Sequence, residues 1–232
     1  MMPLLLLALL GLARLTAAAD PVKVSVYYET LCPDSKKFVI TQLYPVYQEL
    51  KDIMLLDVNA YGKAQDYAVG DSYIFVCQHG PDECEGNKMI ACAKKLIQSE
   101  DVFMAFSNCI MTVFTAAAGG PQCAEKHGID FAPIQLCYSS SEGRRLLHEV
   151  GVKQRTAAPN LDYVPWIIIN DVYTDNQQTE AEKDLKKVVC DAYTGDKPAA
   201  CGEGRFMRFP IYSRRPYGSH GFQNWFSRYW NY

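Results

Sequence analysis

The chain has 232 residues and 49% of them are hydrophobic, which is enough to bury a core in one or two domains. Its formal net charge is −3. Residues 202–232 have a net charge of +4, from five arginines and one glutamate, so the rest of the chain has a net charge of −7. An acidic body lacks the basic surface of a nucleic-acid-binding protein, so we expect no nucleic-acid partner.

The N-terminal residues 1–19 have the composition of a secretory signal peptide. An apolar run of about a dozen residues, too short to span a membrane, is followed by three alanines at 17–19. We expect cleavage after Ala18 or Ala19, a folded domain over 20–201, and secretion of the protein. The alternative is a buried N-terminal helix. No N-x-S/T sequon is present in the sequence, so we expect no N-linked glycan.

Nine cysteines follow this segment, and in an oxidising compartment they predict a disulfide framework. Because nine is odd, one thiol must be left over. We expect Cys32 to be that thiol, and the alternative is that another cysteine, such as Cys109, is free and buried. The eight expected to form structural disulfides are Cys77, Cys84, Cys92, Cys109, Cys123, Cys137, Cys190 and Cys201.

The first three predicted elements form a β-α-β unit. Residues 22–28 are rich in β-branched and aromatic side chains and predict a strand. Residues 33–50 have helical spacing, with Pro33 at the first helical position, Cys32 at the N-cap and a kink at Pro45. Residues 53–60 predict a second strand, parallel to the first.

The segment of about 66–158 interrupts this alternation and predicts a mostly helical insertion that is rich in cysteine. It begins with a possible hairpin over 73–84, and helical patterns follow near 87–98, 101–117 and 139–150. The glycines and proline of 118–121 indicate a break between helices.

After the insertion, two strands are predicted around a turn at Asn170–Asp171, one over 164–169 and one over 172–174. An amphipathic helix over 180–193 follows, with Leu185, Val188 and Val189 facing inward. Pairing of Cys190 with Cys201 would tie this helix to the segment behind it. The whole order is β-α-β, insertion, β-β-α, which is that of an α/β thioredoxin-like fold with a disulfide-rich insertion.

Cys32 and Ser35 are the candidate catalytic pair. A thiol at a helix N-terminus is stabilised as the reactive thiolate by the helix dipole. Disulfide reduction needs a second thiol to release the captured partner, and a serine at position 35 cannot supply it. The site is therefore expected to capture a partner, next to Pro33 and Asp34, without releasing it unaided.

Pro165 is the second element of the candidate site. In the thioredoxin-like fold a proline that starts the third strand is usually cis and lies against the active-site thiol, where the preceding backbone, here that of Val164, pairs with an extended substrate. An ordinary trans-proline at a strand start is the alternative.

The stretch CQHGPDECEGNKMIAC, residues 77–92, matches C-Q-H-G-x-x-E-C-x-x-N-x-x-x-x-C. In this respect the chain resembles the gamma-interferon-inducible lysosomal thiol reductase (GILT) family, over about 22–201. The resemblance implies a thioredoxin-like fold and reduction of protein disulfides at acidic pH, without a bound cofactor, by a C-x-x-C pair at positions 32 and 35. Ser35 departs from that pattern, which makes this chain a CxxS variant.

The same stretch allows a second interpretation, because His79 and Glu83 could be metal ligands. In a secreted chain disulfides are favoured, so we expect a structural block and no metal. His79 and His148 are interpreted as structural residues.

Residues 202–232 combine ten aromatic residues with five arginines. Aromatic and arginine side chains are enriched at contact surfaces, so this tail is a candidate for binding a protein or an anionic membrane surface. A disordered extension is the alternative. The side chains chosen as binding candidates are Arg214, Arg215, Trp225 and Trp230.

Two functions follow from the sequence. The first is a secreted GILT-like protein with little or no autonomous reductase activity, which acts by binding a protein or cell-surface partner. The alternative is a thiol oxidoreductase that reduces disulfide-containing proteins through Cys32 with the help of external thiols, in the lysosome or outside the cell.

Overall fold

The computed structural model describes residues 19–202. The predicted signal peptide, apart from Ala19, and the predicted binding tail, apart from Gly202, lie outside the described residues. In the part that is described, no helix combines the length and apolar character that a membrane crossing requires.

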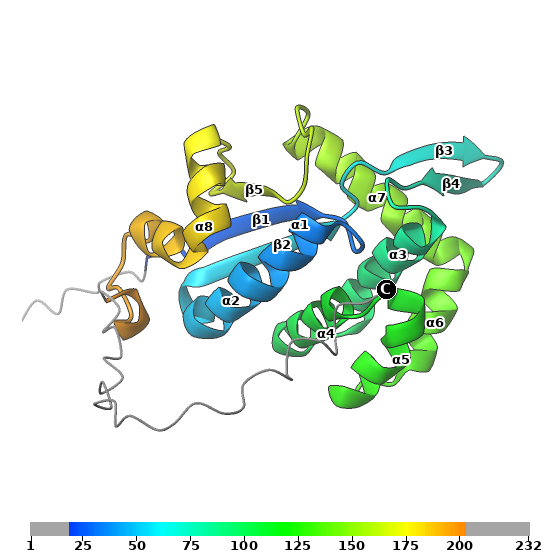
Figure 1. Cartoon of the computed structure of the whole chain (residues 1–232), viewed down its shortest axis with the longest axis horizontal. Coiled ribbons are helices and arrows are strands. Elements are labelled where there is room, and N and C mark those ends of the chain that lie inside the picture. Colours follow the sequence, from blue (N-terminus) through cyan, green and yellow to red (C-terminus); the bar gives the residue numbers. More distant parts are fainter. Residues whose placement is uncertain (1–18, 203–232) are drawn as a thin grey trace, which may run out of the picture. The chain divides into compact units, whose positions relative to one another are not determined.

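A three-stranded sheet of order β2-β1-β5 forms the centre of the fold (Figure 1). β1 (Val22–Tyr28) pairs in parallel with β2 (Met54–Ala60) and antiparallel with β5 (Trp166–Ile169). All residues of β1 except Lys23 are buried, as expected for a central strand of β-branched and aromatic residues. The first two predicted strands and their parallel pairing are confirmed.

The helix predicted over 33–50 consists of α1 (Pro33–Phe38), a π-helical segment (Val39–Leu43) and α2 (Tyr44–Leu50), followed by a 3-10 turn (Lys51–Ile53). The widened turn lies directly before Pro45, which has no N–H to donate to the preceding turn. The kink predicted at Pro45 stays a prediction; the structure has a π-helical segment that ends at Leu43, two residues before this proline.

Between β2 and β5 lie a hairpin and five helices, which gather on one side of the sheet (Figure 1). The hairpin pairs β3 (Gln65–Val69) with β4 (Ser72–Val76). The helices are α3 (Pro81–Leu96), α4 (Glu100–Thr112), α5 (Ala116–Lys126), α6 (Phe131–Ser139) and α7 (Ser141–Ala157).

Several predictions within this insertion were wrong in their bounds. The hairpin predicted over 73–84 lies earlier in the chain, because Gly80, at a φ of 88°, and Pro81 begin α3. The helix expected over 101–117 ends at Thr112, and the predicted break at 118–121 lies inside α5. A Cβ at Gly120 would come within 2.8 Å of the Phe131 ring, so this glycine serves close helix packing and does not end the helix.

The helical pattern over 139–150 covers a boundary between two helices. Ser139 ends α6, and the Ser140 hydroxyl accepts a hydrogen bond from the Glu142 amide at 3.2 Å to cap α7. The prediction treated 139–150 as one helix because the two helices are separated by Ser140 alone, and the apolar spacing does not show so short a break.

The predicted second strand over 172–174 is reduced to a single bridge between Ile169 and Val172. Asn170 and Asp171 have φ values of 50° and 61° and form the predicted turn. The final helix α8 (Asp175–Ala192) begins earlier than the predicted Glu180, because the Thr174 hydroxyl caps it by accepting from the Gln177 amide at 3.2 Å. A 3-10 turn (Ala199–Cys201) follows.

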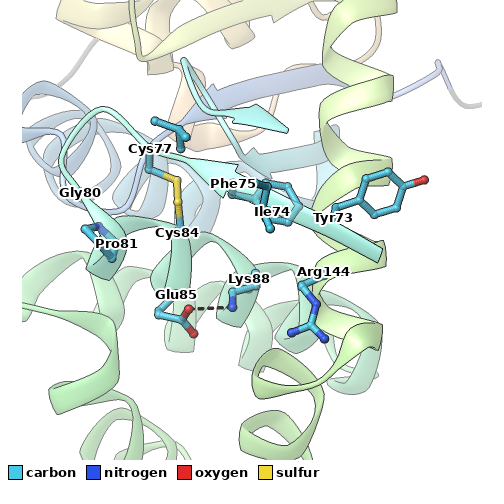
Figure 2. Close-up of a pocket in the computed structure, with 11 residues that line it drawn as sticks. Tyr73, Ile74, Phe75, Cys77, Gly80, Pro81, Cys84, Glu85, Lys88 and Arg144 are labelled. Carbon is cyan, nitrogen blue, oxygen red and sulfur yellow. Dashed lines mark hydrogen bonds and ion pairs between the residues drawn. A yellow bond between two sulfur atoms is a disulfide. The ribbon is translucent and has the colours of Figure 1, made fainter. Parts of the chain in front are cut away.

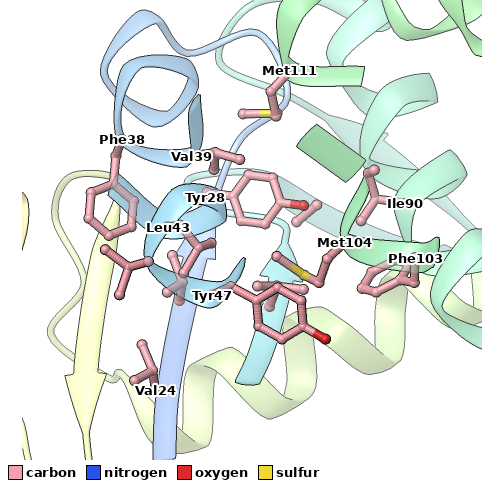
Figure 3. Close-up of a cluster of buried hydrophobic side chains, with 14 of the residues drawn as sticks. Val24, Tyr28, Phe38, Val39, Leu43, Tyr47, Ile90, Phe103, Met104 and Met111 are labelled. Carbon is pink, nitrogen blue, oxygen red and sulfur yellow. The ribbon is translucent and has the colours of Figure 1, made fainter. Parts of the chain in front are cut away.

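One hydrophobic core joins the sheet, α1 and α2 to the insertion (Figure 3). Tyr28 of β1 and Leu43 of the π-helical segment lie in the same buried cluster as Ile90 of α3 and Met104 and Met111 of α4. The insertion is thus part of the main folding unit, and the thioredoxin-like α/β fold with a helical insertion is confirmed.

Four disulfides reinforce this arrangement, and the eight cysteines predicted to be structural form them. Two join helices of the insertion, one closes the loop before α3, and one ties α8 to the final turn. The pairs are Cys92–Cys137, Cys109–Cys123, Cys77–Cys84 and Cys190–Cys201.

Candidate thiol site

Cys32 lies at the N-cap of α1, where the chain leaves β1 and Pro33 takes the first helical position. Within residues 19–202 it is the one cysteine outside a disulfide. Its side chain is buried, with 7% of the residue exposed, and Sγ lies 3.9 Å from the carbonyl oxygen of Val164. The Lys36 amide donates to the Cys32 carbonyl at 2.9 Å and closes the first turn of the helix.

Ser35 is completely buried one turn further along α1. Its Oγ accepts a hydrogen bond from the backbone amide of Glu29 at 3.3 Å. The hydroxyl therefore joins the helix to the end of β1. At the position where a resolving thiol would stand, the chain therefore has a buried hydroxyl that is hydrogen-bonded to the backbone.

The peptide bond between Val164 and Pro165 is cis, as predicted from the order of the strands. Gln178 of α8 holds this segment from behind: its amide nitrogen donates to the Pro165 carbonyl at 2.9 Å, and its amide oxygen accepts from the Ile167 amide at 2.7 Å. The segment before β5 is thereby fixed against Cys32.

Two clefts flank the thiol. One, of about 280 Å³, is lined by Asp34 and Phe38 of α1 and by Val164 and Pro165. The other, of about 530 Å³, is lined by residues that include Pro33, His79 and Phe114. The structure thus brings Asp34, Val164 and Pro165 together in one cleft and places Pro33 in the other; Cys32 is not a lining residue of either, and its Sγ contacts the carbonyl of Val164.

A group of buried polar side chains lies beneath the thiol. Glu29 and Glu83 are fully buried, and both lie close to the ring nitrogen Nδ1 of His79, at 3.3 Å and 2.6 Å respectively. Burial raises the pKa of the Glu29 carboxyl, and the charge of Glu83 raises it further, against the opposing effects of the Lys63 amide and His79. Two carboxyl groups and one imidazole therefore share a site in which, within residues 19–202, both carboxyl side chains are fully buried and the His79 side chain is 31% exposed.

Thr30, between Glu29 and the Cys32 loop, is anchored by α3. Its amide and hydroxyl donate to the Asn87 side-chain oxygen at 3.1 Å and 3.0 Å. A Cβ at Gly86 would come within 2.3 Å of the Thr30 hydroxyl oxygen, so only glycine allows α3 to approach this closely. This contact explains why a glycine and an asparagine stand next to each other in the 77–92 stretch.

The sequence did not single out Glu29, Thr30, Asn87 or Gln178. Glu29 could have been found from the sequence, because it is an acidic residue directly after an apolar strand and stands three residues before Cys32. His148 has the structural role that was predicted: Nδ1 lies 2.5 Å from Asp66, and its ring stacks on Tyr73. Both contacts fasten the β3–β4 hairpin to α7.

A further cavity of about 440 Å³ lies beside the hairpin and the Cys77–Cys84 disulfide (Figure 2). Its walls include Ile74 and Phe75 of β4 and Arg144 of α7, and Glu85 and Lys88 form an ion pair at its edge. Cys32, Ser35 and Pro165 are not among its lining residues. The Cys77–Cys84 disulfide itself forms part of the wall of this cavity.

Comparison with known proteins gives consistent results. Residues 23–127 match the family described as gamma interferon inducible lysosomal thiol reductase (GILT). The gamma-interferon-inducible lysosomal thiol reductase of Carassius auratus is 37% identical over 196 residues, which cover 84% of this chain and 77% of that protein. GILT-like protein 1 of Drosophila melanogaster is 34% identical over 201 residues, which cover 80% of each chain.

Among solved structures, a putative protein-disulfide isomerase from Pseudomonas syringae superposes with a TM-score of 0.51 at 13% sequence identity. The similarity covers 75% of this chain and 94% of that one. At this identity the match concerns the fold alone.

Proposed function

The chain belongs to the gamma-interferon-inducible lysosomal thiol reductase family, and on that premise we propose that it binds disulfide-containing protein segments and captures them on Cys32 without autonomous reductase turnover. The reaction class is thiol–disulfide exchange, and the partner is a protein. The loss of turnover distinguishes this chain from the two-cysteine pattern of its family.

The capture step uses only the thiol and the partner. The Cys32 thiolate attacks one sulfur of the partner disulfide, a bond forms between Sγ and that sulfur, and the partner S–S bond breaks. The displaced partner sulfur leaves as a thiolate and takes a proton from water. One disulfide replaces another, so the step needs no external oxidant or reductant.

The hydroxyl of Ser35, where release would need a thiol, is the observation that carries the proposal. Release of the partner requires a second sulfur to attack the mixed disulfide, and Ser35 Oγ is a buried hydroxyl engaged with the Glu29 amide. The other eight cysteines are already paired in disulfides. The captured partner has no internal route of release.

The cleft next to Cys32 suits an extended segment of the partner. Asp34, Val164 and Pro165 line it, and the carbonyl oxygen of Val164 lies 3.9 Å from Cys32 Sγ. An extended chain laid in this cleft would pair with the Val164 backbone and present its disulfide to Sγ. Lys37, Glu182 and Lys183 also line the cleft, so charged side chains of both signs would contribute to partner selection together with backbone pairing.

A second candidate function is slow reductase activity with an external thiol. It is favoured by the retention of a free Cys32 at a helix N-cap. A small thiol such as glutathione would attack Cys32 Sγ in the mixed disulfide, which releases the reduced partner and leaves a disulfide between Cys32 and glutathione; a second glutathione would attack the glutathione sulfur of that disulfide, which forms oxidised glutathione and frees Cys32.

We place this chemistry in the secretory pathway, either outside the cell or in lysosomes. Four disulfides are typical of proteins that fold in an oxidising compartment. Residues 203–232 are proposed to add a contact with a protein or membrane surface, and a pull-down with and without them tests this: equal recovery of the partner would remove the tail from the proposal.

The central experiment compares the native chain with Ser35→Cys on a disulfide-bonded protein substrate, with and without glutathione, at acidic and neutral pH. Without glutathione, we expect the native chain to accumulate a one-to-one mixed disulfide, visible by mass spectrometry, and Ser35→Cys to release reduced product. Cys32→Ser is the matched control and should form no adduct. Equal rates of product release from the native chain and from Ser35→Cys without glutathione would overturn the proposal.

A further inference from the structure

Three side chains at the thiol site converge on one point. Glu29, Cys32 and His79 each offer a possible metal-ligand atom, and these oxygen, sulfur and nitrogen atoms all lie within 4.8 Å of one another. They come from the end of β1, the N-cap of α1 and the loop before α3. Only the folded chain brings them together.

The Glu29 carboxylate is the strongest sign that a ligand is missing from this group. Its Oε1 accepts a hydrogen bond from the Lys63 amide at 2.6 Å. Its Oε2 is buried and has no hydrogen-bond partner within residues 19–202, although Nδ1 of His79 lies 3.3 Å away without hydrogen-bond geometry. A buried carboxylate oxygen without a partner is unfavourable unless a cation or a donor satisfies it.

The charges around this point are also unbalanced. Glu29 and Glu83 are both fully buried, and the Cys32 thiolate would add a third negative charge. The one basic side chain that contacts the two carboxylates within the described residues is that of His79. A divalent cation would offset this excess where a single imidazole does not.

From these observations we propose that Cys32, His79 and Glu29 form a Zn²⁺ site. One thiolate, one imidazole and one carboxylate are a donor set that suits Zn²⁺, whereas Mg²⁺ and Ca²⁺ prefer oxygen ligands alone. Three protein ligands leave the fourth tetrahedral position open, as in sites where zinc is accessible to water.

The geometry needs only a small adjustment to close around the ion. Zn–S bonds of about 2.3 Å and Zn–N or Zn–O bonds of about 2.0–2.1 Å bring tetrahedral donors to about 3.5 Å from one another. His79 can supply this movement, since its side chain is 31% exposed and lies in the loop before α3. Because Glu83 lies 2.6 Å from Nδ1, Nε2 is the ring nitrogen left to bind the metal, and Glu83 would then orient the ring as a carboxylate does behind a metal-bound histidine.

The ion also has a way in. The cleft lined by Leu31, Pro33, His79 and Phe114 reaches the histidine from solvent and shares no lining residue with the cleft of Pro165. A metal could therefore reach its ligands without crossing the cleft that we assign to the protein partner.

Zinc at this point would control the reactivity of Cys32, a consequence that rests on the proposed function. The metal takes the same sulfur lone pairs that attack a disulfide, so the loaded site cannot capture a partner until zinc leaves. A C-x-x-C pair can protect its thiols as an internal disulfide. Ser35 removes that option, and zinc would provide a reversible form of protection.

The test uses the purified full chain with free Cys32, first stripped of metal with a chelator. We expect one equivalent of Zn²⁺ to bind by calorimetry, Co²⁺ to give a thiolate-to-metal charge-transfer band, and Zn²⁺ to slow alkylation of Cys32 by at least about tenfold. Mg²⁺ should do none of these. Glu29→Gln and His79→Gln should each weaken Zn²⁺ binding by at least about tenfold.

His127→Gln is the matched control, because this histidine follows α5 and is not among the three ligands. It should bind Zn²⁺ like the native chain. Circular dichroism confirms folding, and if Glu29→Gln does not fold, His79→Gln in the loop carries the test. Unchanged alkylation of Cys32 in Zn²⁺, or equal affinity in His79→Gln and His127→Gln, would overturn the zinc site. Failure of metal-free Cys32 to react with alkylating agents or disulfides would instead overturn the proposed function.

Discussion

Ser35 and Ser107 are both buried serines in helices, at 0% and 2% exposure, but their hydroxyls differ in what they contact. Ser35 Oγ accepts from the Glu29 amide, whereas Ser107 Oγ has no partner within residues 19–202. We predict that Ser35→Ala lowers the free energy of unfolding by about 1–2 kcal/mol, because a buried amide loses its acceptor.

Ser107→Ala is the control for this prediction and should change the free energy of unfolding by less than about 0.5 kcal/mol. Urea unfolding of both variants, followed by circular dichroism, measures the difference. If both substitutions lower the free energy of unfolding by the same amount, the hydrogen bond of the Ser35 hydroxyl does not contribute to holding α1 to β1.

The pKa of Asp57, at the edge of the sheet, makes the stability of the protein depend on pH in the acidic range. Burial alone would raise its pKa, but Lys153 and Lys94, with Nζ atoms 2.5 Å and 3.0 Å from the carboxylate, outweigh burial and lower the pKa to about 2. Since the folded pKa lies below the ordinary value of 3.8, the stabilisation is complete above about pH 4 and is lost as pH falls toward 2.

The shift corresponds to about 2 kcal/mol of stability at neutral pH. Asp57→Asn should lose about this much at pH 7 and show a smaller decline in stability between about pH 4 and pH 2 than the native chain. Thermal unfolding across this range measures it. Asp162→Asn, at an exposed position, should follow the native curve; a parallel decline in Asp57→Asn would contradict the assignment.

At the scale of the elements, the site depends on how β5 is attached to α8. Gln178 is 1% exposed and its amide satisfies both the Pro165 carbonyl and the Ile167 amide. We predict that Gln178→Leu costs about 2–4 kcal/mol, because it leaves two buried backbone groups without partners. It should also change the rate of Cys32 alkylation, because Val164 lies against Sγ.

The exposed Gln135 of α6 provides the matched substitution. Gln135→Leu should leave both the unfolding free energy, to within about 0.5 kcal/mol, and the alkylation rate unchanged. An alkylation rate that stays native in Gln178→Leu while stability falls would show that the glutamine supports the fold without positioning the cis-proline segment.

The 77–92 stretch is also best understood as an element. Its cysteines hold the loop and α3, and Gly86 and Asn87 fit the helix against Thr30. His79 of this stretch contacts both Glu83 and Glu29. The sequence predicted a structural block here. The structure adds that the block forms one wall of the thiol site.

At the scale of the whole molecule, disulfides hold an insertion that shares its core with the sheet. Cys92–Cys137 spans 45 residues and Cys190–Cys201 spans 11. In the chain-entropy description, removing the first lowers the unfolding free energy by about 4 kcal/mol and the second by about 3 kcal/mol.

We therefore expect Cys92→Ala/Cys137→Ala to unfold at lower denaturant concentration than Cys190→Ala/Cys201→Ala. Equilibrium unfolding of the two double variants against the native chain gives the order. The reverse order would mean that the end of α8 contributes more to the cooperative core than the insertion does.

The sequence alone determined the features that depend on neighbours along the chain. Strand and helix periods gave β1, the Cys32 helix, β2 and the inward face of α8, because these patterns repeat every two or about 3.6 residues. The odd number of cysteines required a free thiol, and the sequence shows directly that position 35 is a serine and not a cysteine. Boundaries were missed where Gly, Pro or Ser had a packing or capping role, as at Gly120, Pro81 and Ser140.

Only the tertiary structure decided which residues meet. Glu29 and His79 are 50 positions apart in the sequence, and Val164 and Cys32 are 132 apart, yet each pair is in contact. The pairing of the eight disulfide cysteines was also decided by the tertiary structure, because the sequence allows many pairings and the fold brings together the sulfur atoms of one of them. Contacts of this kind depend on how helices and strands pack in three dimensions, which no local period records.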